Sequence, residues 1–168
     1  MDVNSAVDAG LNSMEHLRNL ELSTSKNSDD LFNQRKTLLC CSNISKGSEL
    51  RSKIHNLQRM VAVSNLDTNK MKSVFSKLAK NKVSQTPTLN LYDGFSNYKF
   101  LDDNWTKSFD YLPLKISNKW KSEISNFESL EPNENSKAFS KLMMKIVYEM
   151  KKYNIEFISG TDTPIGYQ

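Results

Sequence analysis

The chain has 168 residues, 38% of them hydrophobic and 25% charged, and this length and composition fit one globular domain with a buried core. No stretch has the apolar length that crossing a bilayer requires. The net charge is +4, but the lysines are spread along the chain and are not grouped with aromatic residues or a known motif. We therefore expect neither a membrane span nor a nucleic-acid partner.

The first third of the chain predicts one short strand among helices. Residues 5–9 have the pattern of a helix end, and Gly10 follows as its C-cap. A short strand is expected at residues 12–16, directly after this junction. Apolar residues at spacings of three and four then predict helices at 20–39 and 49–61.

The middle of the chain predicts a helix followed by a strand. Asp67 is a good N-cap, and the apolar residues that follow it recur at helical spacing as far as Ala79. The period then changes to two over residues 83–91, which predicts a strand. Pro87 lies within this strand and lacks the N–H that a central strand would donate.

The last part of the chain predicts helices and a final strand. Residues 93–131 are rich in aromatic side chains and are expected to be partly helical, with a helix at 116–127. An apolar stripe predicts a helix at 132–153, and a short apolar strand follows at 155–159. Strands that alternate with helices favour βαβ units and a parallel sheet. The predicted fold class is therefore α/β, in a single domain that spans residues 1–168.

The chain has two cysteines, Cys40 and Cys41, which are adjacent in the sequence. Neighbouring residues rarely reach the geometry that a disulfide needs, and one pair makes no disulfide framework. We expect these two residues to be ordinary free thiols.

Two residues that carry chemistry follow predicted parallel strands. His16 ends the first strand, and Asp162 lies just beyond the last one. The C-terminal ends of parallel strands are where α/β proteins bind ligands, and imidazole and carboxylate groups suit zinc and similar ions. A lone histidine at a strand end is also a common structural hydrogen-bonding residue, so the two residues alone leave both roles open.

Three segments of the chain resemble elements of the imidazolonepropionase-like and prolidase-like amidohydrolases. Residues 8–16 resemble the AGxxSxEH element that follows the fifth strand of that family. Residues 78–89 resemble the LAxN and PTL elements at the junction of the seventh helix and strand. Residues 155–164 resemble the eighth-strand element, which ends in GTDTP. The three segments occur in the family's order and span nearly the whole chain.

The resemblance implies a (β/α)8 TIM barrel, of which residues 1–168 would form a part with about three parallel strands. It also implies a centre of one or two divalent metal ions, with zinc expected, that hydrolyses a C–N bond in a non-peptide amide, a cyclic amide or a dipeptide. In this family pattern His16 matches a metal ligand. Asp162 matches a metal ligand that also acts as the base for the attacking water.

Two further residues are candidates for substrate binding. Arg18 lies just past His16 and is placed to face substrate at the barrel mouth, or to cap and ion-pair the following helix. Tyr92 lies just beyond the second predicted strand and is placed to line the pocket, although tyrosine is also common at half-buried positions. His55 lies off the apolar stripe of its helix, so we expect it to be an exposed helix residue.

The family pattern contains groups that this sequence does not supply. It includes a His-x-His pair, a carboxylated lysine and a further histidine, whereas the only histidines here are His16 and His55. We therefore expect residues 1–168 to be a fragment of such an enzyme that is inactive by itself. The alternative is a non-catalytic remnant that acts as a protein-binding or regulatory module.

Overall fold

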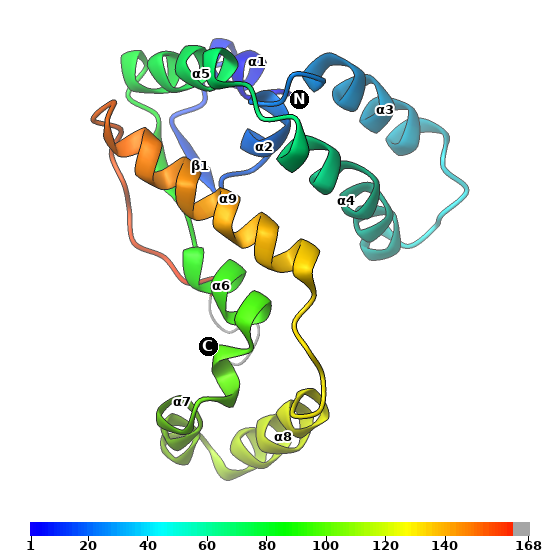
Figure 1. Ribbon diagram of the computed structural model, residues 1–168, viewed down its shortest axis with the longest axis vertical. Coiled ribbons are helices and arrows are strands. Elements are labelled where there is room, and N and C mark those ends of the chain that lie inside the picture. The colour runs from blue at the N-terminus through cyan, green and yellow to red at the C-terminus, as the bar shows by residue number, and fades with distance from the viewer. Residues whose placement is uncertain (163–168) are drawn as a thin grey trace. The chain divides into compact units, whose positions relative to one another are not determined.

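A computed structural model describes residues 1–162, apart from the side chain of Phe95. The fold is α/β and mostly helical, and its two strands are parallel (Figure 1). In chain order the elements are α1 (Val3–Asp8), β1 (Ser13–Glu15), α2 (Leu20–Ser23), α3 (Ser28–Cys41), α4 (Gly47–Ser64), α5 (Thr68–Lys80), β2 (Ser84–Thr86), α6 (Leu89–Asn97), η1 (Lys99–Leu101), α7 (Asp103–Lys107), η2 (Ser108–Tyr111), α8 (Leu114–Ile124), η3 (Ser125–Phe127) and α9 (Glu134–Lys151).

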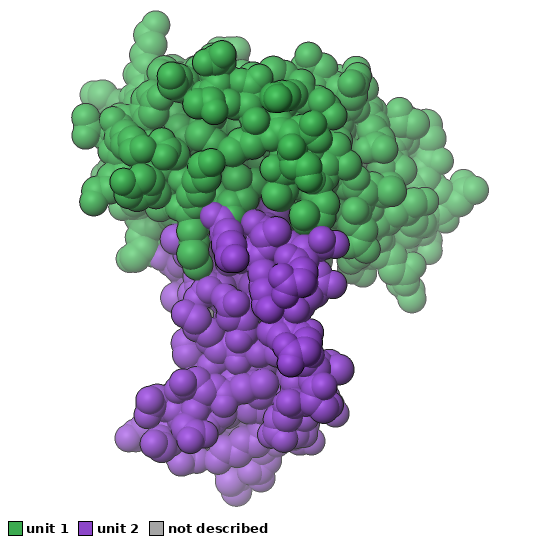
Figure 2. Space-filling model, viewed as in Figure 1, with its two compact units in different colours: residues 1–87, 142–159 green, residues 88–141, 160–168 purple. Residues whose placement is uncertain are grey.

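The chain divides into two compact units, which Figure 2 colours separately. The first unit takes residues 1–87 and 142–159, and the second takes residues 88–141 and 160–168. Helix α9 begins in the second unit and continues into the first. The sequence predicts a single domain over residues 1–168, and the division into two compact units does not test that prediction.

The parallel strands lie in the first unit. Ser13 pairs with Ser84, and Glu15 pairs with Thr86, so β1 and β2 run in the same direction in register. A third segment joins the other side of β2, because Gln85 forms a parallel bridge with Phe157. The Gln85 N–H donates to the Glu156 carbonyl oxygen at 2.9 Å, and the Ile158 N–H donates to the Gln85 carbonyl oxygen at 2.8 Å. The predicted parallel order is confirmed, with the last strand reduced to a bridge.

The strand predicted at residues 83–91 is too long. Strand β2 ends at Thr86, and helix α6 begins at Leu89. Pro87 has no N–H to donate, and Thr88 has a left-handed φ of 48°, which turns the chain away from the extended direction. The alternation beyond Thr86 therefore belongs to the entry of a helix.

Caps fix the ends of the helices where the sequence predicts them. The Asp67 side chain accepts hydrogen bonds from the backbone N–H groups of Asn69 (2.8 Å) and Lys70 (3.0 Å), which begins α5. Gly10 follows α1 with a φ of +91°, a backbone conformation that favours glycine. The buried side chains of α5 are the ones that the helical spacing predicts: Met71, Val74, Phe75 and Leu78.

Apolar side chains of the first unit pack together in two places. Helices α2, α3 and α4 bury Leu22, Leu31, Phe32 and Ala62 together, and α3 packs against α4 (Figure 1). In the other place, Phe75 of α5 meets Tyr153 edge to face, with ring centroids 5.7 Å apart. The first-unit part of α9 contributes Met143, Ile146 and Met150, which are fully buried.

The second unit packs around aromatic rings. Phe100, Phe109 and Ile124 form its buried core, and Tyr98, Trp105, Trp120 and Phe127 pack against them. The Phe109 and Trp120 rings meet edge to face at 5.4 Å. This confirms that the aromatic-rich segment is partly helical, and the helix predicted at 116–127 corresponds to α8 together with η3.

The prediction of two free thiols is wrong. The structure joins Cys40 and Cys41 in a disulfide between neighbouring residues at the end of α3. Helix α3 ends at Cys41, and the backbone becomes extended at Ser42. Cys40 and Cys41 are therefore the last two residues of α3, where the regular helix gives way to extended backbone.

Candidate functional site

His16 lies at the C-terminal edge of the parallel strands. Its backbone N–H donates to the Thr86 carbonyl oxygen at 2.9 Å, so the residue continues the ladder between β1 and β2 by one step. Its side chain is only 19% exposed, and Nε2 lies 3.7 Å from a carboxylate oxygen of Glu15. The structure therefore fixes the backbone of His16 at the strand end that the sequence predicts.

Residues that follow the strands adopt strained backbone conformations. His16 and Leu17 have φ angles of 57° and 48°, although neither is glycine. In the second unit, Thr88 follows β2 with a φ of 48°, and Asp162 follows the last bridge with a φ of 64°. A non-glycine residue in this region costs about 1–3 kcal/mol, and such residues gather at functional sites. Positive φ angles also occur away from the strand ends, at Asn19, Lys82, Tyr98 and Asn154, so the strain alone does not single out the predicted site.

Asp162 and Tyr92 lie in the second unit. Asp162 is partly exposed and lies five residues beyond Phe157, while Thr163 and Pro164 of the GTDTP element lie outside the described residues. Tyr92 is on α6, where its ring meets Phe139 edge to face at 5.7 Å. This contact gives Tyr92 a packing role, and its predicted role in substrate binding stays a prediction.

The predicted metal ligands are of chemical types that zinc binds. Imidazole and carboxylate are both zinc ligands, and catalytic zinc sites use three protein ligands with an open position for water. His16 lies in the first unit and Asp162 in the second, and their joint role as metal ligands stays a prediction. Within residues 1–162, no three side chains of the types His, Cys, Asp or Glu are grouped so that they could hold a metal ion.

Arg18 belongs to a cluster that the sequence analysis missed. It lies near Glu21, which is only 6% exposed, and burial raises the pKa of the Glu21 carboxyl above its usual value. The charges of Arg59, Arg35 and Arg18 act in the opposite direction and lower that pKa. Arg35 donates from Nε to the Gln58 Oε1 atom at 2.9 Å and from Nη1 to the Asn19 Oδ1 atom.

His55 is a further member of this cluster, and the prediction of an exposed histidine is wrong. The residue is half-buried, and burial together with the charges of the surrounding arginines lowers its pKa to about 4. His55 of α4 lines a pocket together with Arg35 and Leu39 of α3. One signal was present in the sequence: the basic residues include only four arginines, and all four fall between positions 18 and 59.

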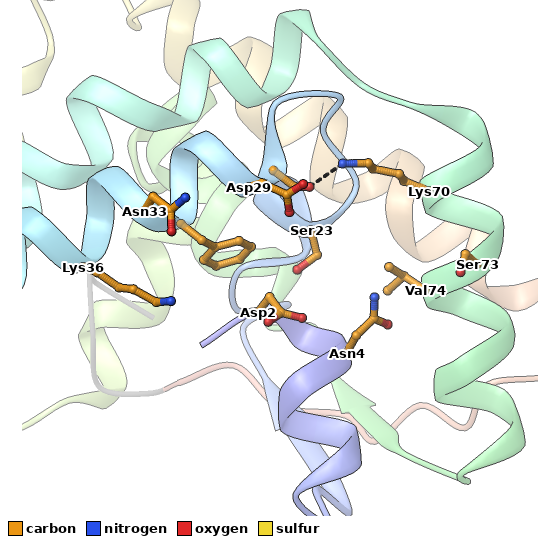
Figure 3. Close-up of a pocket in the computed structure, with 11 residues that line it drawn as sticks. Asp2, Asn4, Ser23, Asp29, Asn33, Lys36, Lys70, Ser73 and Val74 are labelled. Carbon is orange, nitrogen blue, oxygen red and sulfur yellow. Dashed lines mark hydrogen bonds between the residues drawn. The ribbon is translucent and has the colours of Figure 1, made fainter.

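A separate polar pocket of about 540 Å³ lies among α1, α3 and α5 (Figure 3). Two of its charged side chains form hydrogen bonds with neighbouring residues. The Asp2 carboxylate accepts from the Ser5 N–H at 3.0 Å and caps α1, and the Lys70 ammonium donates to the Ser28 hydroxyl. Asp29 and Lys36 line the pocket as well, so acids and bases are balanced. This pocket has no excess charge that would select a charged ligand.

None of the helices in residues 1–162 combines the length and the apolar character that a bilayer crossing requires. Comparison of the chain with protein-family models, with curated proteins and with solved structures finds no match.

Proposed function

We propose that the chain contributes strands six to eight, and two metal ligands, to a metal-dependent amidohydrolase with a (β/α)8 barrel. One observation carries the proposal. The three segments that resemble this family contain, in chain order, the parallel strands β1 and β2 and the residue Phe157, which forms a parallel bridge to β2. In a (β/α)8 barrel, consecutive strands are parallel neighbours in the same way.

The connections between these strands support the same topology. Helices α2 to α5 join β1 to β2, and helices α6 to α9 join β2 to the bridge at Phe157. Parallel neighbours need such long crossovers, which are usually helical. A barrel places its catalytic residues just beyond the C-terminal ends of its strands, where His16 lies after β1.

Each candidate residue has a distinct role in this proposal. A bound divalent metal ion would lower the pKa of a water molecule and polarise the amide carbonyl. The His16 imidazole would hold the ion, and the Asp162 carboxylate would hold it and accept the proton of the attacking water. Arg18 and Tyr92 would contact the substrate, which belongs to the non-peptide amides, cyclic amides or dipeptides. The remaining metal ligands would come from chain outside residues 1–168, and residues 1–168 alone would be inactive.

The test uses the complete gene product that contains these residues, assayed on N-acyl amino acids, dipeptides and cyclic amides. We expect hydrolysis that a chelator abolishes and added zinc restores. Asp162→Asn should lower kcat by about 100-fold or more, because it removes the base. Asp110→Asn is the matched control, since Asp110 is an exposed residue of η2 paired with Lys121 at 2.6 Å, and it should leave kcat unchanged. Hydrolysis that survives both chelation and Asp162→Asn would contradict the mechanism.

A further inference from the structure

A pocket of about 380 Å³ in the first unit brings basic side chains to one place. Arg18 reaches it from the segment between β1 and α2, Arg35 from α3, and Arg51 and His55 from α4. Among the described residues that line the pocket, none is acidic. Three guanidinium groups therefore share one cavity without a carboxylate in its wall.

The basic residues around His55 are arginines, whereas the rest of the chain uses lysine. The sequence has 23 basic residues, and the four arginines among them, at positions 18, 35, 51 and 59, all act on the same imidazole, that of His55. Every other basic residue is a lysine. Guanidinium groups present a planar fork of donors that matches carboxylate and phosphate oxygens, which an ammonium group does not.

Two of these arginines have guanidinium N–H groups that are available to a ligand. Arg18 and Arg51 are exposed, and within residues 1–162 neither side chain makes a hydrogen bond or an ion pair. Arg35 is held in place by Gln58 and Asn19, which leaves one terminal nitrogen of its guanidinium group uncommitted among the described contacts. The pocket thus has one anchored guanidinium group and two adjustable ones.

The positive charge of the pocket is only partly balanced. The buried Glu21 carboxyl group is not part of the pocket lining, and it interacts electrostatically with Arg59, Arg35 and Arg18, so one acid opposes several bases. His55 adds no further positive charge near neutral pH, because its pKa is lowered to about 4. An anion in the pocket would face the guanidinium groups and a neutral imidazole, which can still donate or accept a hydrogen bond.

Part of the pocket lining is apolar. Leu39, Leu50 and Ile54 line the pocket, and Leu39 is 60% exposed. Pockets that hold small organic molecules combine such an apolar lining with a few convergent polar groups. An inorganic anion alone would leave this wall without a contact.

We propose that this pocket binds a small organic anion, whose carboxylate or phosphate group lies between Arg18, Arg35 and Arg51 and whose apolar body lies against Leu39, Leu50 and Ile54. This site shares Arg18 with the proposed amidohydrolase site. It needs no metal ion and no hydrolysis, so anion binding by the metal-free chain tests it apart from the proposed enzyme activity.

The test is calorimetric titration of the 168-residue chain with phenyl phosphate and benzoate, which separate the two head groups. Inorganic phosphate serves as the anion without an apolar body, and benzyl alcohol as the apolar body without charge. We expect one of the two aromatic anions, or both, to bind, and benzyl alcohol to bind about tenfold or more weakly. Equal binding of benzyl alcohol, or no binding of either aromatic anion, would overturn the proposal.

Variants assign the binding to this pocket. The double variant Arg18→Gln and Arg51→Gln should weaken binding about tenfold or more, and because both residues are exposed it should remain folded. The matched control is Lys36→Gln with Lys53→Gln, which removes the same charge from exposed positions of α3 and α4 outside the pocket. If the control weakens binding as much as the arginine variant, attraction is general and the proposal is wrong.

The histidine rings give a second readout by NMR. A bound anion offsets the arginine charges, so the pKa of His55, about 4 in the free chain, should rise when phenyl phosphate is bound. The ring signals of His16, which does not line the pocket, should not respond to the ligand. An unchanged His55, or an equal response of both rings, would contradict binding at this pocket.

Discussion

Gln58 shows how one buried polar side chain joins two helices. It is fully buried on α4, and its Nε2 atom donates to the Leu31 carbonyl oxygen at 2.7 Å and to the Gln34 Oε1 atom at 2.8 Å. Its Oε1 atom accepts from Arg35 Nε at 2.9 Å. These bonds fix α4 against α3 and orient Arg35 in the pocket of the arginine cluster.

Gln58→Leu should destabilise the chain by about 1–3 kcal/mol, because it leaves the buried donors and acceptors around it without partners. Urea denaturation followed by circular dichroism measures this change. The control is Asn33→Ala, which changes an exposed side chain of α3 that makes no hydrogen bond to Gln58 and should alter the free energy of unfolding by about 0.5 kcal/mol or less. Equal effects of the two variants would contradict the role given to burial.

His55 predicts a pH dependence of stability. The ordinary pKa of 6.5 applies to the unfolded chain, and burial with the nearby arginines lowers it to about 4 in the folded chain. Between these pH values the unfolded chain binds a proton that the folded chain does not. The contribution of His55 to stability is therefore fully present above pH 6.5 and is lost as the pH falls toward 4.

His55→Gln should remove this part of the pH dependence. Because the ring is half-exposed and solvent screens the charges, we expect a contribution of about 1–2 kcal/mol across this range. Urea denaturation of both chains at a series of pH values gives the difference. Asn56→Gln, at an exposed neighbouring position of α4, should follow the wild-type curve. A His55→Gln chain that keeps the full wild-type slope would show that the imidazole is not buried among the arginines.

At the scale of elements, local patterns predict the helices well and the strands less well. The spacing of apolar residues and the Asp67 cap are enough to define α5, because a helix makes its hydrogen bonds within itself. A strand needs a partner. Alternation from residue 83 to 91 produces a strand only at Ser84–Thr86, where β1 and the segment around Phe157 lie on either side.

The end of α1 gives a matched test of backbone conformation. Gly10 has a φ of +91°, whereas Gly47, the first residue of α4, has no positive φ, and an added Cβ atom would meet no neighbour at either position. Gly10→Ala should cost about 1–3 kcal/mol from backbone strain alone. Gly47→Ala should stabilise the chain by about 0.5–1 kcal/mol through helix propensity. Thermal unfolding of both variants measures these changes, and a similar Tm for the two would contradict the left-handed turn at Gly10.

At the scale of the whole molecule, the sequence predicts the parallel strand order and the place of His16, since both depend on the order of elements. It does not predict the cluster of Glu21, Arg35 and His55. These residues are separated by 14 and 20 positions in the sequence, and the packing of α2, α3 and α4 against one another brings them together. Predictions from sequence therefore succeed for the topology and fail for contacts between helices.

We propose that the parallel strands and the residues His16 and Asp162 belong to a larger metal-dependent enzyme. Native mass spectrometry of the gene product purified from its source cells tests this in one measurement, because it reports both chain mass and bound metal. We predict a chain well above the 19.3 kDa of residues 1–168, with one or two divalent metal ions bound. A metal-free protein of 19.3 kDa would contradict the account.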